Sequence, residues 1–445
     1  MDRESLLSGL EHFDPEIFGR FQEELQRQRY MLSFVPTINA ESPYAAYLEG
    51  SVLASCYLDY HTKEQPYRGF EKIAAERAKS LFHSDHAIVR LDGIAAASRT
   101  VLRALLPDGG QVLSFRNRKK EHVRGDAYTF ASFGVDLVSR EVNWAELQEK
   151  ADSLKPALVI FSPVNYAKQT DYGRMADIAH AAGARFWVDL GQNVGLTAAG
   201  LLASPVSFAD VVTFPTNDSL RGPEGAVILC RENLADILDQ TVLESGFASI
   251  HKNKLAALAL ALHEAASPEY RAYGRQVLQN AKALAKSLQA NGIEVLSGGT
   301  ENHLVIAKLP ADIDAAHIDE NMAKAGFYTK KDETLLDEKG EPLCILRLSC
   351  LSPTTRSLKE SDMEKAGELL AKAIRAASDA ERETIRETVG MSVMDKPIFS
   401  EEWLPKARVH DRFFDGSDRV TAREVAASER RDFVKKLFLH KDGQH

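Results

Sequence analysis

Charged side chains that follow or interrupt apolar runs are the first candidates for chemistry. Arg347 lies within such a run, and the planar fork of donors of an arginine suits two-point pairing with a carboxylate. Asp189 and Asp218 each come at or after the end of another apolar run. Carboxylates combined with an imidazole such as His122 are ligand types for Mg, Mn or Zn, but no short ligand spacing supports a metal and we expect none. What these groups do depends on the elements that position them.

Bulk composition limits the classes of partner. The chain has 445 residues, a net charge of -9 and a pI near 5.9, so it lacks the basic excess that nucleic acid or an anionic membrane surface requires. Its first residues are polar and acidic, and no apolar stretch reaches roughly 18 residues, so we expect neither a leader nor a spanning helix. The four cysteines show no paired spacing, which favours a reducing, cytoplasmic location.

Short apolar runs alternate with helical patterns from about residue 86. Several of the runs have the length of buried parallel strands, so the alternation predicts a large α/β domain with a mostly parallel sheet. Shorter elements near the end predict a small C-terminal α+β domain. We therefore expect an N-terminal arm and helices at 1–85, the large domain at 86–255, a connecting helix at 256–292, the small domain at 293–377 and a charged extension at 378–445.

The charged extension carries three large aromatic residues, Trp403, Phe413 and Phe414, among polar ones. A large aromatic side chain in a polar segment favours docking over disorder. We expect this extension to be an arm or a partner-docking segment.

Several blocks of the chain resemble serine hydroxymethyltransferases, in the same order over roughly residues 10–375. One block reads Ser-Gly-Gly-Thr-Glu-Asn-His-Leu, which differs at one position from the family's Ser-Gly-Gly-Thr-Asp-Asn-His-Leu. The resemblance implies an aspartate-aminotransferase-like fold, fold type I of the pyridoxal-phosphate enzymes, and a dimer. The blocks that carry it are 47–53, 77–82, 188–200, 209–225 and 297–304.

The resemblance also implies roles for residues around a cofactor. Asp189 falls on the aspartate that pairs with the pyridine nitrogen, and His122 falls on the histidine that stacks on the cofactor ring. Gln192 replaces a family histidine. Asp218 stands where the family lysine forms a Schiff base with pyridoxal phosphate, and a carboxylate cannot form that bond.

The phosphate end of this implied site is altered as well. The family's Ser-Gly-Ser run is replaced by Gly93, Ile94 and Ala95, which have no side-chain donor. Burying a phosphate without enough donors is costly. Together with Asp218, this change predicts that no cofactor is bound, or that pyridoxal phosphate is held only noncovalently.

The substrate end is better preserved. By the resemblance, Arg347 falls on the arginine that binds the amino-acid carboxylate, Tyr57 and Asp59 fall on a tyrosine and a glutamate, and Thr37 falls on a serine. Asp59 is one methylene shorter than the glutamate, so proton transfer would be misplaced unless the backbone shifts. Asp59, His122 and Asp218 are therefore the candidate catalytic residues, beside a carboxylate site made by Thr37, Tyr57 and Arg347.

These substitutions predict a pseudoenzyme that has lost covalent pyridoxal-phosphate chemistry. It would act as a subunit of a homodimer, or of a heterodimer with an active paralogue, or it would bind a small carboxylate or amino acid. Two alternatives stay open: a repurposed, cofactor-independent enzyme of specialised metabolism, and a true glycine or serine hydroxymethyltransferase-type transferase. A purely structural role is also open for two of these residues. Arg347 could be a salt-bridged arginine at the core edge, and Asp189 could be a structural carboxylate.

Overall fold

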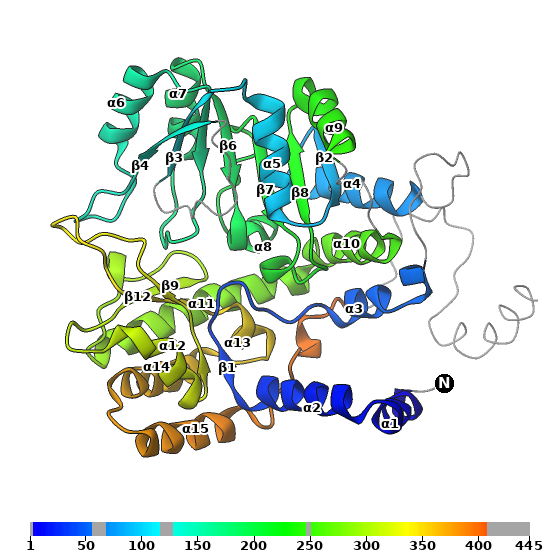
Figure 1. The fold of residues 1–445 in the computed structure, drawn as a ribbon, viewed down its shortest axis with the longest axis vertical. Helices are drawn as coiled ribbons and strands as arrows, with labels where there is room; N and C mark the ends of the chain where they lie inside the picture. Colours follow the sequence, from blue (N-terminus) through cyan, green and yellow to red (C-terminus); the bar gives the residue numbers. More distant parts are fainter. Residues whose placement is uncertain (1–2, 56–67, 116–127, 246–250, 407–445) are drawn as a thin grey trace, which may run out of the picture. The chain divides into compact units, whose positions relative to one another are not determined.

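A seven-stranded sheet organises the larger part of the fold (Figure 1). The computed structural model describes residues 3–55, 68–115, 128–245 and 251–406. The strand order is β2-β8-β7-β6-β5-β3-β4, and only β8 runs antiparallel to its neighbours. The prediction of an α/β fold with a mostly parallel sheet is confirmed. The strands are β2 (His86–Leu91), β3 (Gln111–Phe115), β4 (Thr129–Phe133), β5 (Leu158–Phe161), β6 (Arg185–Asp189), β7 (Val211–Pro215) and β8 (Ala226–Cys230).

Helices cover both faces of this sheet, which is why its central strands are mostly apolar and buried. Successive side chains of a strand point to opposite faces, so Trp187 packs with one face and Val188 with the other. One face is covered by α5 (Ile94–Leu105) and α9 (Ala235–Glu244). The other is covered by α4 (Arg68–Phe82), α6 (Trp144–Leu154), α7 (Tyr172–Ala181) and α10 (Lys252–Ala265), and the short α8 (Val194–Ala198) follows β6.

A second core lies around a three-stranded antiparallel sheet of order β11-β12-β9. The long helix α11 (Pro268–Ala290) is capped at its N-terminus by Ser267, whose hydroxyl accepts from the Tyr270 amide at 3.1 Å. Its first half packs in the first core and its second half in the second, so α11 joins the two. The remaining elements here are β9 (Leu304–Lys308), α12 (Ile318–Lys324), β11 (Lys331–Asp332), β12 (Ile345–Ser349), α13 (Leu351–Thr355) and α14 (Glu360–Arg375).

The first and last described segments pack on both cores, with Leu32 and Val389 in the second core and Trp403 in the first. The N-terminal part contains α1 (Arg3–Phe13), α2 (Pro15–Tyr30), β1 (Leu32–Ser33) and α3 (Pro43–Glu49), and β1 pairs in parallel with β10 (Phe327–Tyr328). The C-terminal part contains α15 (Asp379–Val393), which contacts α2, and the short helix η8 (Glu401–Trp403). Residues Met1–Pro405 form one compact unit. No helix in the described ranges is long and apolar enough to cross a bilayer.

Helix α15 begins at a capping box. The Ser378 hydroxyl accepts from the Glu381 amide at 3.2 Å, and the Glu381 carboxylate accepts from the Ser378 amide at 3.3 Å. We expect Ser378→Ala to lower the free energy of unfolding by about 1 kcal/mol in denaturant titrations. Glu387→Ala, on the exposed middle of the same helix, is the control and should change it by less than about 0.5 kcal/mol. Equal effects of the two substitutions would contradict the capping role.

Candidate functional site

The carboxyl ends of parallel strands in the large sheet assemble the candidate site. Ligands bind at this edge in open α/β sheets, because loops from neighbouring strands meet there. Gly93 follows β2, Ser162 follows β5, Asp189 ends β6 and Asp218 follows β7. The apolar strands are buried in the sheet, and the polar residues that follow them lie at its carboxyl edge.

Asp189 is held in a fixed orientation at the end of β6. Its side chain is buried, with Oδ2 accepting from the Ser162 hydroxyl at 3.3 Å and Oδ1 accepting from the Gly191 amide at 3.2 Å. These two donors fix the orientation of the carboxylate at the carboxyl end of β6.

Asp218 begins a tight, strained turn. It is only 5% exposed, and its φ of 45° lies in the left-handed region, as does that of Arg221 at 58°. The Gln192 amide donates to Asp218 Oδ2 at 3.2 Å, whereas Oδ1 is buried without a partner among the described residues. Burial raises the pKa of the Asp218 carboxyl to about 6, the Gln192 hydrogen bond opposes this, and the Glu224 charge adds to it. The structure therefore places Asp189, Gln192 and Asp218 in one cluster.

Close contacts from two other segments hold the Asp218 turn. The Gly195 amide donates to the Ser219 hydroxyl at 2.9 Å, and a Cβ at Gly195 would come within 2.7 Å of the Ser219 carbonyl oxygen. From the N-terminal segment, the Asn39 side-chain amide donates to the Asp218 carbonyl at 2.8 Å. The turn can approach α8 only because residue 195 is glycine.

Arg347 reaches the same edge from the small sheet. Its Nη2 donates to the Val164 carbonyl at 2.9 Å, two residues beyond the Ser162 that contacts Asp189. The side chain is buried, and its Nε has no hydrogen-bond partner among the described residues. No carboxylate in those residues forms an ion pair with it, although Asp332 exerts a weaker electrostatic effect. Burial lowers the pKa of the guanidinium, because desolvation disfavours the charged form.

His303 is a buried imidazole close enough to Arg347 to feel its charge. Its Nδ1 is 2.9 Å from the Ser349 hydroxyl, and burial, followed by the Arg347 charge, lowers its pKa to about 3. We expect its ring chemical shifts in NMR spectra to stay constant between about pH 5 and 8. His86, whose pKa is raised by its pairing with Asp239, is the internal reference and should shift as it titrates. A titration of His303 in this range would contradict its buried neutral state.

The remaining predicted site residues fall in different places. Gly93 is the residue before α5, and Ala95 is in the first turn of that helix. Thr37 is exposed in a turn and lies two residues from Asn39. Tyr57, Asp59 and His122 lie outside the described residues. Among the residues that the structure does describe, no cluster of three or more His, Cys, Asp or Glu side chains is arranged to hold a metal ion.

Comparison with known proteins gives the family of the chain. The sequence model of the family described as serine hydroxymethyltransferase matches residues 10–370. A serine hydroxymethyltransferase from Myxococcus xanthus (strain DK1622) is 32% identical over 386 residues, which cover 83% of this chain and 92% of the relative. The chain belongs to the serine hydroxymethyltransferase family. Members of this family are transferases of amino-acid metabolism with the type I fold and are typically oligomeric.

Family membership corrects one prediction. The expectation that no cofactor is bound is wrong, because serine hydroxymethyltransferase enzymes use pyridoxal phosphate and nothing found here indicates a cofactor-free state. The prediction counted only side-chain donors at the phosphate end. In the structure, Gly93 precedes a helix of 12 residues, and a Cβ at this position would meet open space. The backbone N–H groups at a helix N-terminus attract phosphate whatever side chains they carry.

The described residues suit two of the three groups of the cofactor that the protein must bind: its phosphate and its pyridine nitrogen, but not its aldehyde. The N-terminus of α5 suits its phosphate and Asp189 suits its pyridine nitrogen. The aldehyde is not matched, since Asp218 presents a carboxylate where the family lysine supplies an amine.

Two residues of this site were not predicted from the sequence. Asn39 holds the Asp218 turn, and Arg221 at the end of that turn is an arginine with only 1% of its surface exposed. Asn39 lies 179 residues from Asp218 in sequence, so no local pattern could pair them. The one available signal was the loop containing Thr37, which resembles the family's Ala-Ser-Glu-Asn segment and carries its asparagine at position 39.

Proposed function

We propose that this serine hydroxymethyltransferase-family protein binds a small carboxylate or amino acid at Arg347, and that it cannot carry out the lysine-dependent covalent step. The observation that carries the proposal is the buried Arg347 guanidinium. Within the described part of the chain it makes one hydrogen bond, to the Val164 carbonyl, and its Nε has no partner. A buried cation without an ionic partner is costly to the fold, and an anionic ligand that pairs with it in a two-point geometry offsets that cost.

The other residues of the cluster have separate roles in this proposal. Asp189 orients a group at the carboxyl end of β6, and Asp218 holds or releases a proton at its unpaired Oδ1. When bound, pyridoxal phosphate supplies an electron sink for reactions at the α-carbon of an amino acid, and Asp189 and the first turn of α5 are the residues that would hold it. Tyr57, Asp59, His122 and Thr37 complete the proposed ligand site.

Calorimetric titration of the purified full chain tests the proposal. We expect glycine, L-serine and acetate to bind saturably, with dissociation constants between about 1 µM and 1 mM. Glycinamide, which lacks the carboxylate, should bind at least about tenfold more weakly, because Arg347 would be left without its anion. The absence of saturable heat with all three carboxylates would refute carboxylate binding.

Retained transferase activity is the second candidate function. It is favoured by the identity shared with the Myxococcus xanthus serine hydroxymethyltransferase and by the buried positions of Asp189 and Arg347. Release of the α-proton of glycine, followed as exchange in deuterated water, is the sensitive assay. Exchange above that of an Arg347→Gln variant would support the transferase, and equal rates would favour the binding protein.

We further propose that the protein works as a dimer, either of two copies or with a lysine-bearing paralogue. The typical oligomeric state of the family supports a dimer. Native mass spectrometry of the protein purified from its host distinguishes the two arrangements by subunit mass. A monomer under these conditions would contradict both.

A further inference from the structure

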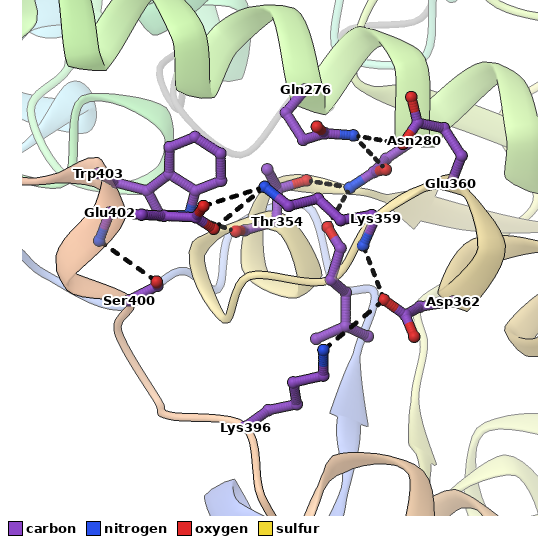
Figure 2. A network of polar contacts seen from close by, with 11 residues as sticks. Gln276, Asn280, Thr354, Lys359, Glu360, Asp362, Lys396, Ser400, Glu402 and Trp403 are labelled. Atoms are coloured by element: carbon purple, nitrogen blue, oxygen red, sulfur yellow. Dashed lines mark hydrogen bonds and ion pairs between the residues drawn. The ribbon is translucent and has the colours of Figure 1, made fainter.

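Trp403 is buried between helices α13 and α11. It lies in η8, beyond the 10–370 region that the family model matches. The side chain is 5% exposed, and its indole Nε1 donates to the Thr354 carbonyl at 2.7 Å. Figure 2 draws this hydrogen bond. The indole ring packs edge-on against Tyr273 with 5.7 Å between centroids. The last described part of the chain is thus packed into the body.

Contacts of polar and charged groups also hold the residues around Trp403 in place. Lys359 lies with Nζ 4.2 Å from the centre of the Trp403 ring and 3.1 Å from Glu402 Oε1. The Ser400 amide donates to the Thr355 carbonyl at 2.8 Å. Aromatic packing, a cation over the ring and a main-chain hydrogen bond together hold residues 399–403 in one position. We call residues 399–403 the clasp.

The clasp contacts the Asp218 turn through Arg221. The Arg221 Nη2 donates to the Trp403 carbonyl at 3.4 Å, and its guanidinium lies 4.4 Å from the ring centre of Tyr273 and 5.0 Å from that of Phe399. Because Arg221 is the last residue of the turn that begins at Asp218, its fixed side chain limits how far the turn can move.

A second connection reaches the other end of the turn. The Tyr273 hydroxyl, on the ring against which Trp403 packs, accepts from the Asn39 side-chain amide at 3.2 Å. The same Asn39 amide donates to the Asp218 carbonyl at 2.8 Å, and Thr355 donates to Asn39 Oδ1 at 2.8 Å. Both ends of the Asp218–Arg221 turn are therefore connected to residues that the clasp packs against.

We propose that the clasp is a positioning device for the candidate site, in which Trp403 holds the Asp218–Arg221 turn closed against water through Arg221 and Tyr273. The importance of the turn rests on the proposed function, but its dependence on Trp403 does not. In this proposal Trp403 acts only through these neighbours and has no direct role in ligand binding. Residues beyond the family match thereby control the environment of the position that carries the lysine in the family.

The solvent environment of Asp218 provides a test that needs no ligand. The unfolding free energy of each protein is compared with that of its Asp218→Asn counterpart across a range of pH. The difference changes between the pKa of Asp218 in the unfolded chain, 3.8, and its pKa in the folded protein. We call the fitted pKa of the folded protein the midpoint. In the wild-type background we expect a midpoint near 6. In the Trp403→Ala background we expect it to fall by about one pH unit, a tenfold change in acid dissociation, because water reaches the carboxyl. Gln192 and Glu224 also act on this carboxyl and are unchanged in both backgrounds.

Trp144→Ala is the matched control, because Trp144 lies on α6 against Arg174, away from the contacts of the turn. It should lower stability without moving the midpoint. A lower stability with an unmoved midpoint in Trp403→Ala as well would overturn the proposal.

If Trp403→Ala does not fold, Trp403→Phe decides, since it keeps a ring but loses the indole donor. A fall of at least about 0.3 pH unit supports the clasp, and a smaller change overturns it. If the midpoint shifts as expected but the wild-type protein binds none of the carboxylates in calorimetry, the proposed function is rejected and the role of the clasp stands.

Discussion

The Arg347→Gln variant is expected to bind small carboxylates at least about 100-fold more weakly than the wild type, which corresponds to about 3 kcal/mol. The arginine offers a charged fork of donors in a buried position, and glutamine replaces it with a neutral amide. The affinity for acetate and glycine, measured by calorimetry, checks this directly. Arg347→Lys keeps the charge but loses the two-point geometry, so it should fall between the two proteins.

Stability separates this effect from simple unfolding. Arg347 has one hydrogen bond to the Val164 carbonyl and no ion pair among the described residues, so its removal relieves much of the cost of a buried charge. The melting temperature of Arg347→Gln should therefore stay close to that of the wild type. Arg174→Gln, which removes an arginine stacked on Trp144, is the control for binding and should leave affinity unchanged. Wild-type affinity in Arg347→Gln would show that the carboxylate binds elsewhere.

The sheet was predictable because its strands are short, apolar and separated by helical patterns. The run Leu158 to Phe161 is buried at every position, as expected of a parallel strand covered on both faces. The break between α10 and α11 at Ser267 and Pro268 is also a local signal, although the pattern had suggested one long helical stretch. Properties encoded by neighbouring residues can be recovered from the sequence.

Contacts between distant segments could not be recovered in this way. Trp403 stands among charged residues, and that composition indicated a docking arm, but the side chain is buried against Thr354 and Tyr273. Nothing local distinguishes a tryptophan that packs on its own chain from one that packs on a partner. The same limit applies to Arg347, whose contact with Val164 spans 183 residues.

The error about the cofactor has a related origin. Side-chain types are visible in a sequence, whereas backbone donors become visible only when helix ends are placed. Ile94 and Ala95 looked unable to bind phosphate, yet they form the first turn of α5 after the open position at Gly93. The change at Asp218 is different, because no backbone group can replace the lysine amine.

Replacing Asp218 with Asn is expected to stabilise the fold by about 3 kcal/mol near pH 8 and to have little effect below about pH 4. The reason is the raised pKa of the buried carboxyl, about 6 against an ordinary value of 3.8. This difference of about two pH units corresponds to about 3 kcal/mol. Below the ordinary pKa the group is protonated in both folded and unfolded chains, so it costs nothing. As pH rises toward 6 the unfolded chain ionises first, stability falls, and the full penalty is present above the folded pKa.

Asparagine is the informative substitution because it changes charge with little change in shape. It tolerates the left-handed backbone of residue 218, and its side-chain oxygen can still accept from Gln192. Denaturant titrations of both proteins at several pH values measure the difference in free energy of unfolding. Asp177→Asn, at an exposed position on α7, is the control and should change it by less than about 0.5 kcal/mol at every pH. A gain for Asp218→Asn that did not depend on pH would rule out a buried, titrating carboxylate at this position, and with it the role of Asp218 as a proton carrier in the ligand site.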